Sequence, residues 1–198
     1  MLIDLIVYLE PPSEIKQQVD YFLDTTADSI GFTTANKYRC HVSMTGFFQA
    51  DHDQMDTVKE ILDKVLKHDF KDNPKLDWNP LIVKDKLTSD PYHVLLPVFV
   101  SDEYRQCMQT FAKEARSRLD ITVRPKRIDH ISLAYWDEHE KKDCRELFEK
   151  IKEAADAYFN QIGCNGPWSI VLYQRSFRGD GQREPHIFKE ISRWNVQQ

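Results

Sequence analysis

Two kinds of apolar segment alternate along this chain of 198 residues, and the same order of segments occurs twice. Strand-like runs, rich in β-branched and aromatic residues, are predicted at 2–9, 39–48, 78–83, 92–100, 127–136, 168–174 and 187–191. Apolar residues at helical spacing predict helices at 14–29, from 53 onward, from 102 onward and at 141–159. Ser13 and Ser101 stand where N-cap residues are expected. The repeated order β-α-β-α-β predicts an α/β (α+β) fold made of two similar halves.

The break between the two halves falls near residues 85–90 and is too short to act as a domain linker. The length of the chain also suits one domain. We therefore expect a single domain over residues 1–198, with lobes of about 1–85 and 86–198 that share one core. If a pseudo-twofold axis relates the halves, equivalent strands from the two halves lie side by side.

Charge and composition restrict the partners that this chain can take. Hydrophobic residues make up 41% of the sequence, which is enough for a substantial core, and the formal net charge is −5. Surfaces that grip long nucleic acids are broadly basic, so no long nucleic acid is expected as a partner. The net charge still allows a small nucleotide to bind in a local basic pocket.

The cysteines and the first residues indicate a cytoplasmic protein. The four cysteines show no C-x-x-C spacing and no zinc-type cluster with histidine, and a chain of this length does not need disulfides. Residues 2–9 are apolar but contain an aspartate and follow no basic segment, which favours a buried strand over a signal peptide. No apolar run approaches the ~20 residues of a membrane span. Without heptads or an exposed apolar stripe, a monomer is expected.

One strand in each half carries a histidine followed two residues later by a serine. In the first half these residues are His41 and Ser43, and in the second half they are His130 and Ser132. Alternate residues of a strand point to opposite faces, so each histidine shares a face with its serine. The equivalent position of the two pairs in the repeated order carries more weight than either pair alone, and it predicts one cleft that contains both histidines.

This arrangement suits the cleavage of a phosphodiester. Histidine has an ordinary pKa of about 6.5, so one copy can accept a proton from water while the other donates a proton to the leaving oxygen. The hydroxyls of Ser43 and Ser132 can donate hydrogen bonds to the non-bridging phosphoryl oxygens. No carboxylate cluster accompanies the histidines in the sequence, so neither a metal ion nor a cofactor is expected.

Four further residues are candidates for substrate binding. Arg39 lies two residues before His41 on the same expected face, and Arg175 lies on a later strand, so either arginine can contact phosphate or remain an ordinary surface residue. Phe47 and Tyr92 are aromatic candidates for stacking on a base, with core packing as the default for Phe47. Tyr135 is expected in the core. The other five histidines are treated as surface or core residues.

The two motifs resemble those of a known superfamily. His41-Val-Ser-Met and His130-Ile-Ser-Leu resemble the paired H-x-[ST]-x motifs of the two-histidine (2H) phosphoesterases. The longer segments His41–Phe48 and His130–Tyr135, together with the segment from Trp168 to Arg178, resemble the phosphoesterase domain of the TULA (suppressor of T-cell receptor signalling) proteins. The resemblance covers about residues 2–192, although a Pro-x-x-His sequence is absent and both motif hydroxyls are serine where threonine is common.

The resemblance implies a bilobal fold with a concave sheet face, helices outside, and hydrolysis of 2′,3′-cyclic nucleotides, with the 3′-phosphate favoured as product. The ubiquitin-binding, SH3 and histidine-phosphatase modules of the TULA proteins have no counterpart in these 198 residues, so the signalling roles of those proteins are not carried over.

Two other interpretations stay open. A second enzyme class within the superfamily cleaves 2′-5′ oligoadenylate or processes RNA ends, although the acidic net charge disfavours a long substrate. A third interpretation is a nucleotide-binding or partner-binding module without turnover. The expected partner is a small nucleotide or a short RNA end, and no membrane is expected to bind.

Overall fold

The computed structural model describes residues 1–69, 76–78, 84–86, 93–136, 145–159, 166–181 and 183–196. The strands are β1 (Leu2–Glu10), β2 (Val42–Ser43), β3 (Phe48–Asp51), β4 (Leu76–Trp78), β5 (Lys84–Lys86), β6 (His93–Val100), β7 (His130–Tyr135), β8 (Trp168–Phe177) and β9 (Ile187–Val196). The α-helices are α1 (Ser13–Ser29), α2 (Met55–Asp69), α3 (Asp102–Leu119) and α4 (Arg145–Phe159). Short 3₁₀ helices are η1 (Thr34–Lys37) and η2 (His52–Gln54).

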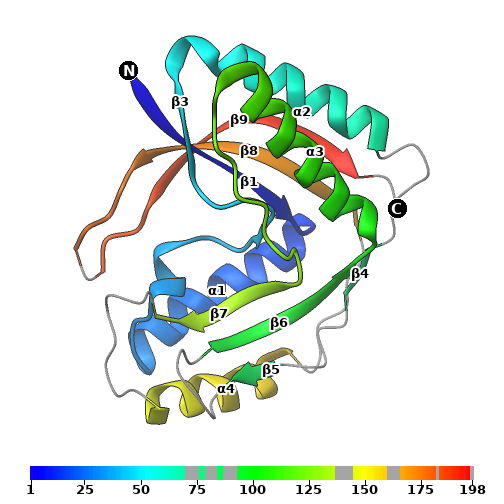
Figure 1. The fold of residues 1–198 in the computed structure, drawn as a ribbon. Coiled ribbons are helices and arrows are strands. Elements are labelled where there is room, and N and C mark those ends of the chain that lie inside the picture. The colour runs from blue at the N-terminus through cyan, green and yellow to red at the C-terminus, as the bar shows by residue number, and fades with distance from the viewer. Residues whose placement is uncertain are drawn as a thin grey trace.

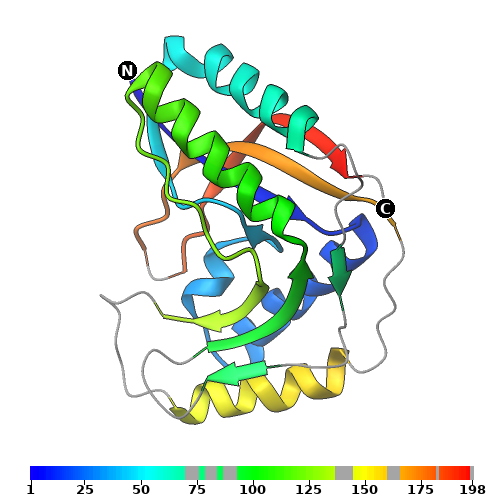
Figure 2. The same ribbon diagram turned by 45° about the vertical axis from the view of Figure 1, so that its right-hand side comes forward.

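The strands form one sheet in the order β4-β6-β7-β2-β1-β8-β9, with β3 paired to β1 and β5 paired to β6. The pairings between these strands are antiparallel. Helices α2 and α3 lie together beyond β1, β8 and β9, whereas α1 and α4 lie at the other end of the molecule, near β6 and β7 (Figure 1). The turned view shows the same two helix pairs on the outside of the strands (Figure 2). The predicted mixed α/β architecture, with helices outside the sheet, is confirmed.

Strands from the two sequence halves alternate in the sheet. The motif strands β2 and β7 are neighbours, as the pseudo-twofold argument predicts, and β1 pairs with β8 from the far end of the chain. The division into lobes of about 1–85 and 86–198 stays a prediction, and the pairing of β1 with β8 crosses it. Both halves are therefore needed to build either side of the sheet.

The prediction of one continuous strand over residues 39–48 is wrong. Strand β2 contains only Val42 and Ser43. After Ser43 the chain bends towards β1, where the N–H groups of Met44 and Thr45 both donate to the carbonyl oxygen of Val7. Thr45 is buried rather than on the open face, since its hydroxyl accepts the N–H of Val7 at 3.0 Å. After this turn, β3 pairs with the first half of β1.

Smaller differences occur at the ends of elements. Ser13 is the first residue of α1 and Pro12 occupies the N-cap position, whereas Ser101 is the N-cap of α3 as predicted. The last strand is longer than expected, because it continues its pairing with β8 to Val196. The predicted start of the fourth helix, at residues 141–144, lies outside the described residues.

The core lies between the sheet and the helices. Phe22, Phe111, Phe148 and Trp168, from three helices and a strand, are all at most 3% exposed. Cys40 and Cys107 are buried, while Cys144 and Cys164 fall outside the described residues. Among the helices that the structure describes, none combines the length and apolar character that crossing a bilayer requires.

Candidate active site

His41 is held in one orientation by the main chain next to it. The Nδ1–H of its imidazole donates to the carbonyl oxygen of Arg39 at 2.7 Å, which leaves Nε2 as the free ring nitrogen. The ring also stacks on Tyr8, with centroids 3.8 Å apart and an interplanar angle of 28°. Burial lowers the pKa of His41 to about 4, although the Arg39 carbonyl opposes this effect. His41 is therefore a neutral imidazole near pH 7, able to accept a proton.

His130 is oriented by a carboxylate instead of a carbonyl. Its Nδ1 lies 2.6 Å from Oδ1 of Asp129, and the His130 side chain is 25% exposed. Asp129 is held in turn by the guanidinium of Arg127, at 3.2 Å. The carboxylate fixes Nδ1 as the donor and orients the ring. No pattern in the sequence distinguishes Asp129, although it directly precedes the motif.

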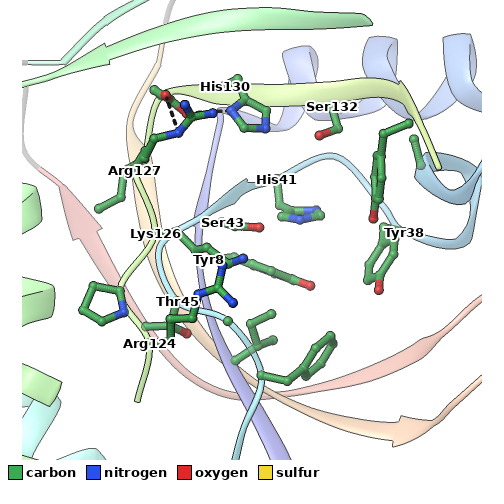
Figure 3. A pocket seen from close by; sticks show the side chains of 18 of the residues that line it. Tyr8, Tyr38, His41, Ser43, Thr45, Arg124, Lys126, Arg127, His130 and Ser132 are labelled. Carbon is green, nitrogen blue, oxygen red and sulfur yellow. Dashed lines mark hydrogen bonds and ion pairs between the residues drawn. The ribbon is translucent and has the colours of Figure 1, made fainter. Parts of the chain in front are cut away.

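Both histidines line one cavity of about 820 Å³. Val42 of β2 is the register partner of Ile131 of β7, so by this register Ser43 lies opposite His130 and His41 lies opposite Ser132. Figure 3 shows the two rings and the two serine side chains around one shared space. The predicted convergence of the two motifs on one cleft therefore holds in the structure.

One wall of the cavity is basic despite the net charge of the chain. The charged residues that line the cavity are Arg39, Arg105, Arg124, Lys126, Arg127 and Asp129. Arg124 and Lys126 lie beside Thr45 (Figure 3), because Gly46 N–H donates to the Arg124 carbonyl and Lys126 N–H donates to the Met44 carbonyl. Two effects lower the pKa of Lys126: partial desolvation, which is the larger, and the nearby positive charge of Arg124. An anion is the ligand that such a wall favours.

The other wall is aromatic. Tyr8, Tyr38 and Phe47 line the cavity. The ring of Phe47 stacks on the ring of Phe188 in β9, with centroids 6.2 Å apart. Tyr8 and Tyr38 both contact the ring of His41, with centroids 3.8 and 5.8 Å away (Figure 3). A cavity with basic and aromatic walls suits a ligand that has both an anionic group and a flat ring.

The predicted substrate-binding residues occupy different positions. Phe47 lines the cavity, and Arg39 lies at its rim, where its guanidinium pairs with Asp24 at 3.0 Å while its carbonyl binds His41. Arg175 is not among the residues that line the cavity: its guanidinium carbon lies 4.0 Å from the Phe47 ring centroid, and the guanidinium pairs with Asp4 at 2.6 Å. Tyr92 lies outside the described residues. The roles of these residues in binding substrate stay predictions.

Two residues of the second half line the cavity although neither was predicted there. Tyr135 was expected in the core, and it packs against the core while also lining the cavity. His93 was expected to be a surface or core residue, and it lines the cavity as well. For Tyr135 the cause is a bulge: Ser132 pairs with Leu95 and Ala134 with Val94, which leaves one extra residue on β7. The extra residue reverses the alternation of faces along β7, so Tyr135 points into the cavity opposite His93, which shares the face of Leu95 on β6. A period of two along the sequence contains no signal for this reversal.

Similar proteins share this fold at low sequence identity. No family model matches the chain. The structure of E. coli LigT in complex with 3′-AMP is 13% identical and covers all of both chains, with a TM-score of 0.55. The complex of E. coli LigT with NADP⁺ superposes with a TM-score of 0.54 at the same identity and coverage. The chain has the 2H phosphoesterase fold. The predicted superfamily resemblance is thus confirmed for the fold, while the closer likeness to the TULA proteins stays a prediction.

A curated relative matches part of its own length. Ecdysteroid-phosphate phosphatase of Bombyx mori is 22% identical over 184 residues, which is 88% of this chain. The chain spans only 25% of the length of that relative, so the similarity does not show that the two proteins share an activity. Among the described residues, no group of three or more histidine, cysteine or carboxylate side chains is placed to hold a metal ion.

Proposed function

We propose that this protein hydrolyses 2′,3′-cyclic nucleotide phosphodiesters to nucleoside monophosphates, with the two histidines as an acid–base pair. The observation that carries the proposal is the asymmetry of the two rings within one cavity. Both rings have Nδ1 bound, by the Arg39 carbonyl for His41 and by the Asp129 carboxylate for His130. Each ring therefore has Nε2 left for chemistry, in one case with a neutral partner and in the other with an anionic partner.

The asymmetry assigns a role to each histidine. Neutral His41 accepts a proton from a water molecule through Nε2 as the water oxygen attacks phosphorus. His130, oriented by Asp129, gives a proton from Nε2 to the ribose oxygen as the phosphorus–oxygen bond breaks. One water is consumed, and proton exchange with solvent restores both rings. When the 2′-oxygen leaves, the product is the 3′-phosphate that the resemblance favours.

The remaining cavity residues hold the substrate. The hydroxyls of Ser43 and Ser132 donate to the non-bridging oxygens, where negative charge grows in the transition state. The aromatic wall of Tyr8, Tyr38 and Phe47 takes the base. This mechanism requires no metal and no cofactor. E. coli LigT, a structural neighbour, forms complexes with 3′-AMP, ATP and NADP⁺, all of which are small nucleotides.

The test is incubation with 2′,3′-cyclic AMP, GMP, CMP and UMP in the presence of EDTA, with chromatography to resolve the 2′- and 3′-monophosphates. We expect turnover that falls by about 10²–10⁴-fold in His41→Ala and in His130→Ala. His52→Ala is the matched control, because His52 is exposed and does not line the cavity. A near-normal rate in His41→Ala rules out the mechanism.

The basic wall supports a second candidate, cleavage at RNA ends or of 2′-5′ oligoadenylate. Arg124 has no carboxylate partner among the described residues and lies close enough to Lys126 to influence its pKa. These cations suit a second phosphate group next to the scissile one. Arg124→Gln should then weaken the binding of a cyclic phosphate that carries a 5′-phosphate more than it weakens the binding of the same cyclic phosphate without one. Equal losses favour the mononucleotide.

A module that binds nucleotides or a partner without turnover is the outcome if none of these substrates reacts but nucleotide still binds. We also propose a monomer in the cytoplasm. The buried thiol of Cys40 accords with a reducing compartment. Light scattering at two protein concentrations tests the monomer, since a dimer would change its mass on dilution.

A further inference from the structure

His93, a third histidine, lies beside the serine of the second motif. Its Nε2 is 3.1 Å from Oγ of Ser132. Its ring also meets the ring of His130 edge-on, with centroids 4.8 Å apart and an interplanar angle of 85°. His93 is half-buried and lines the same cavity as both motif histidines. The position therefore connects His93 directly to the phosphate-binding part of the proposed site.

Regular alternation along β6 puts His93 on the same face as Leu95, which lies opposite Ser132, and the bulge in β7 sets which residue of β7 lies opposite His93. The regular pairing of Ser132 with Leu95 would put His93 opposite Ala134, but the extra residue shifts its partner to Tyr135. Bulges near functional sites commonly re-aim side chains in this way. The His93 ring is consequently enclosed by Ser132, His130 and Tyr135, whose ring centroid lies 5.9 Å away.

The hydrogen bond between His93 and Ser132 has two possible directions with opposite consequences. A serine hydroxyl has one hydrogen to donate and two lone pairs that accept. If Nε2 of His93 accepts, the only hydrogen of Ser132 is used and none remains for phosphate. If Nε2–H of His93 donates, Oγ is held in place and its hydrogen remains available for a phosphoryl oxygen.

We propose that His93 is a positioning residue that donates through Nε2–H to Ser132 and so directs the Ser132 hydroxyl to the phosphoryl group. The inference rests on the proposed function, because it requires a phosphoryl group beside Ser132. His93 itself touches no reacting atom in this scheme. The tautomer of His93 decides whether Ser132 binds phosphate as a donor.

The first motif offers an internal control. Among the described residues, the hydroxyl of Ser43 has no hydrogen-bond partner, so nothing comparable to His93 directs it. A change at His93 should therefore affect the contribution of Ser132 and leave that of Ser43 intact. General damage to the cavity would reduce both contributions.

A double-mutant cycle tests this coupling. We expect His93→Leu to lower kcat/KM by about tenfold, as loss of one hydrogen bond to a group that binds a charged oxygen would. His93→Gln should recover most of the activity, because its amide nitrogen can donate in place of Nε2. In a Ser132→Ala background His93→Leu should lower kcat/KM no further, whereas in a Ser43→Ala background it should lower kcat/KM by the full factor. Equal factors in both backgrounds overturn the inference.

A second measurement needs neither turnover nor a folded variant. In wild-type protein with labelled histidine, ¹⁵N–¹H NMR reports which ring nitrogen of His93 carries hydrogen while inorganic phosphate is bound. Hydrogen on Nε2 supports the inference, and a bare Nε2 overturns it. If no cyclic nucleotide is hydrolysed, the double-mutant cycle is repeated with the Kd of inorganic phosphate as the measured quantity. Coupling between His93 and Ser132 in that Kd upholds the inference although the proposed function has failed. A protein that binds no phosphate overturns both.

Discussion

The carboxylate of Asp129 should matter more to turnover than to folding, and Asp129→Asn separates the two effects. Asp129 binds Nδ1 of His130 at 2.6 Å, and its side chain is 36% exposed. The asparagine has nearly the same shape but no charge, so it loses a charge-assisted hydrogen bond worth about 1.5–3 kcal/mol. Because Asp129 is partly solvated, we expect a value towards the lower end, which corresponds to a loss of about 10- to 30-fold in kcat.

The loss should fall on kcat because the positive charge on His130 is needed at the chemical step and not for binding the base. Steady-state hydrolysis of a 2′,3′-cyclic nucleotide gives kcat and KM separately, and urea unfolding checks stability. Asp56→Asn makes the same change at a carboxylate whose side chain is 92% exposed and pairs with Lys59. A kcat for Asp129→Asn within twofold of wild type would refute the assignment of His130 as the acid.

Three further predictions concern pH and stability. The folded pKa of His41 is about 4 and its unfolded value is about 6.5, so below pH 6.5 the unfolded chain binds a proton that the folded protein does not, and stability falls as pH falls towards 4. In urea unfolding, wild type should lose about 1–2 kcal/mol more than His41→Gln between pH 7 and pH 4.5, and equal losses would contradict this. Asp20→Ala should lower the free energy of unfolding by about 1–3 kcal/mol, because the Cys40 N–H loses its acceptor at 2.6 Å. Arg175→Met should lower the Tm, because Asp4 loses its ion-pair partner, while KM stays within twofold of the wild-type value. A raised KM at an unchanged Tm would instead assign Arg175 to substrate binding.

Local patterns were sufficient for much of the fold and for the centre of the site. Helical spacing of apolar residues located the four helices, and strict alternation placed each motif histidine on the face of its serine. Both signals depend only on neighbours in the chain, because a helix repeats every 3.6 residues and a strand every two. For that reason His41, Ser43, His130 and Ser132 could all be predicted.

The residues that orient the histidines were harder to find. Tyr8 is 33 positions away from His41 in the sequence, yet β1 brings its ring under the imidazole. Asp129 adjoins its histidine, but nothing in the sequence distinguishes it from an ordinary surface carboxylate. Its role follows from a distance of 2.6 Å that only the folded chain has.

The sequence by itself determined which faces of the strands are apolar, where the helices lie, and that two matched histidine–serine pairs occur at equivalent points. Only the tertiary structure decided that β2 is short, that Thr45 is buried, and that a bulge turns Tyr135 into the cavity opposite His93. The physical reason is that strand partners and bulges are set by hydrogen bonds between segments far apart in the chain. One extra residue between two such bonds reverses every side chain beyond it, and no local periodicity contains that information.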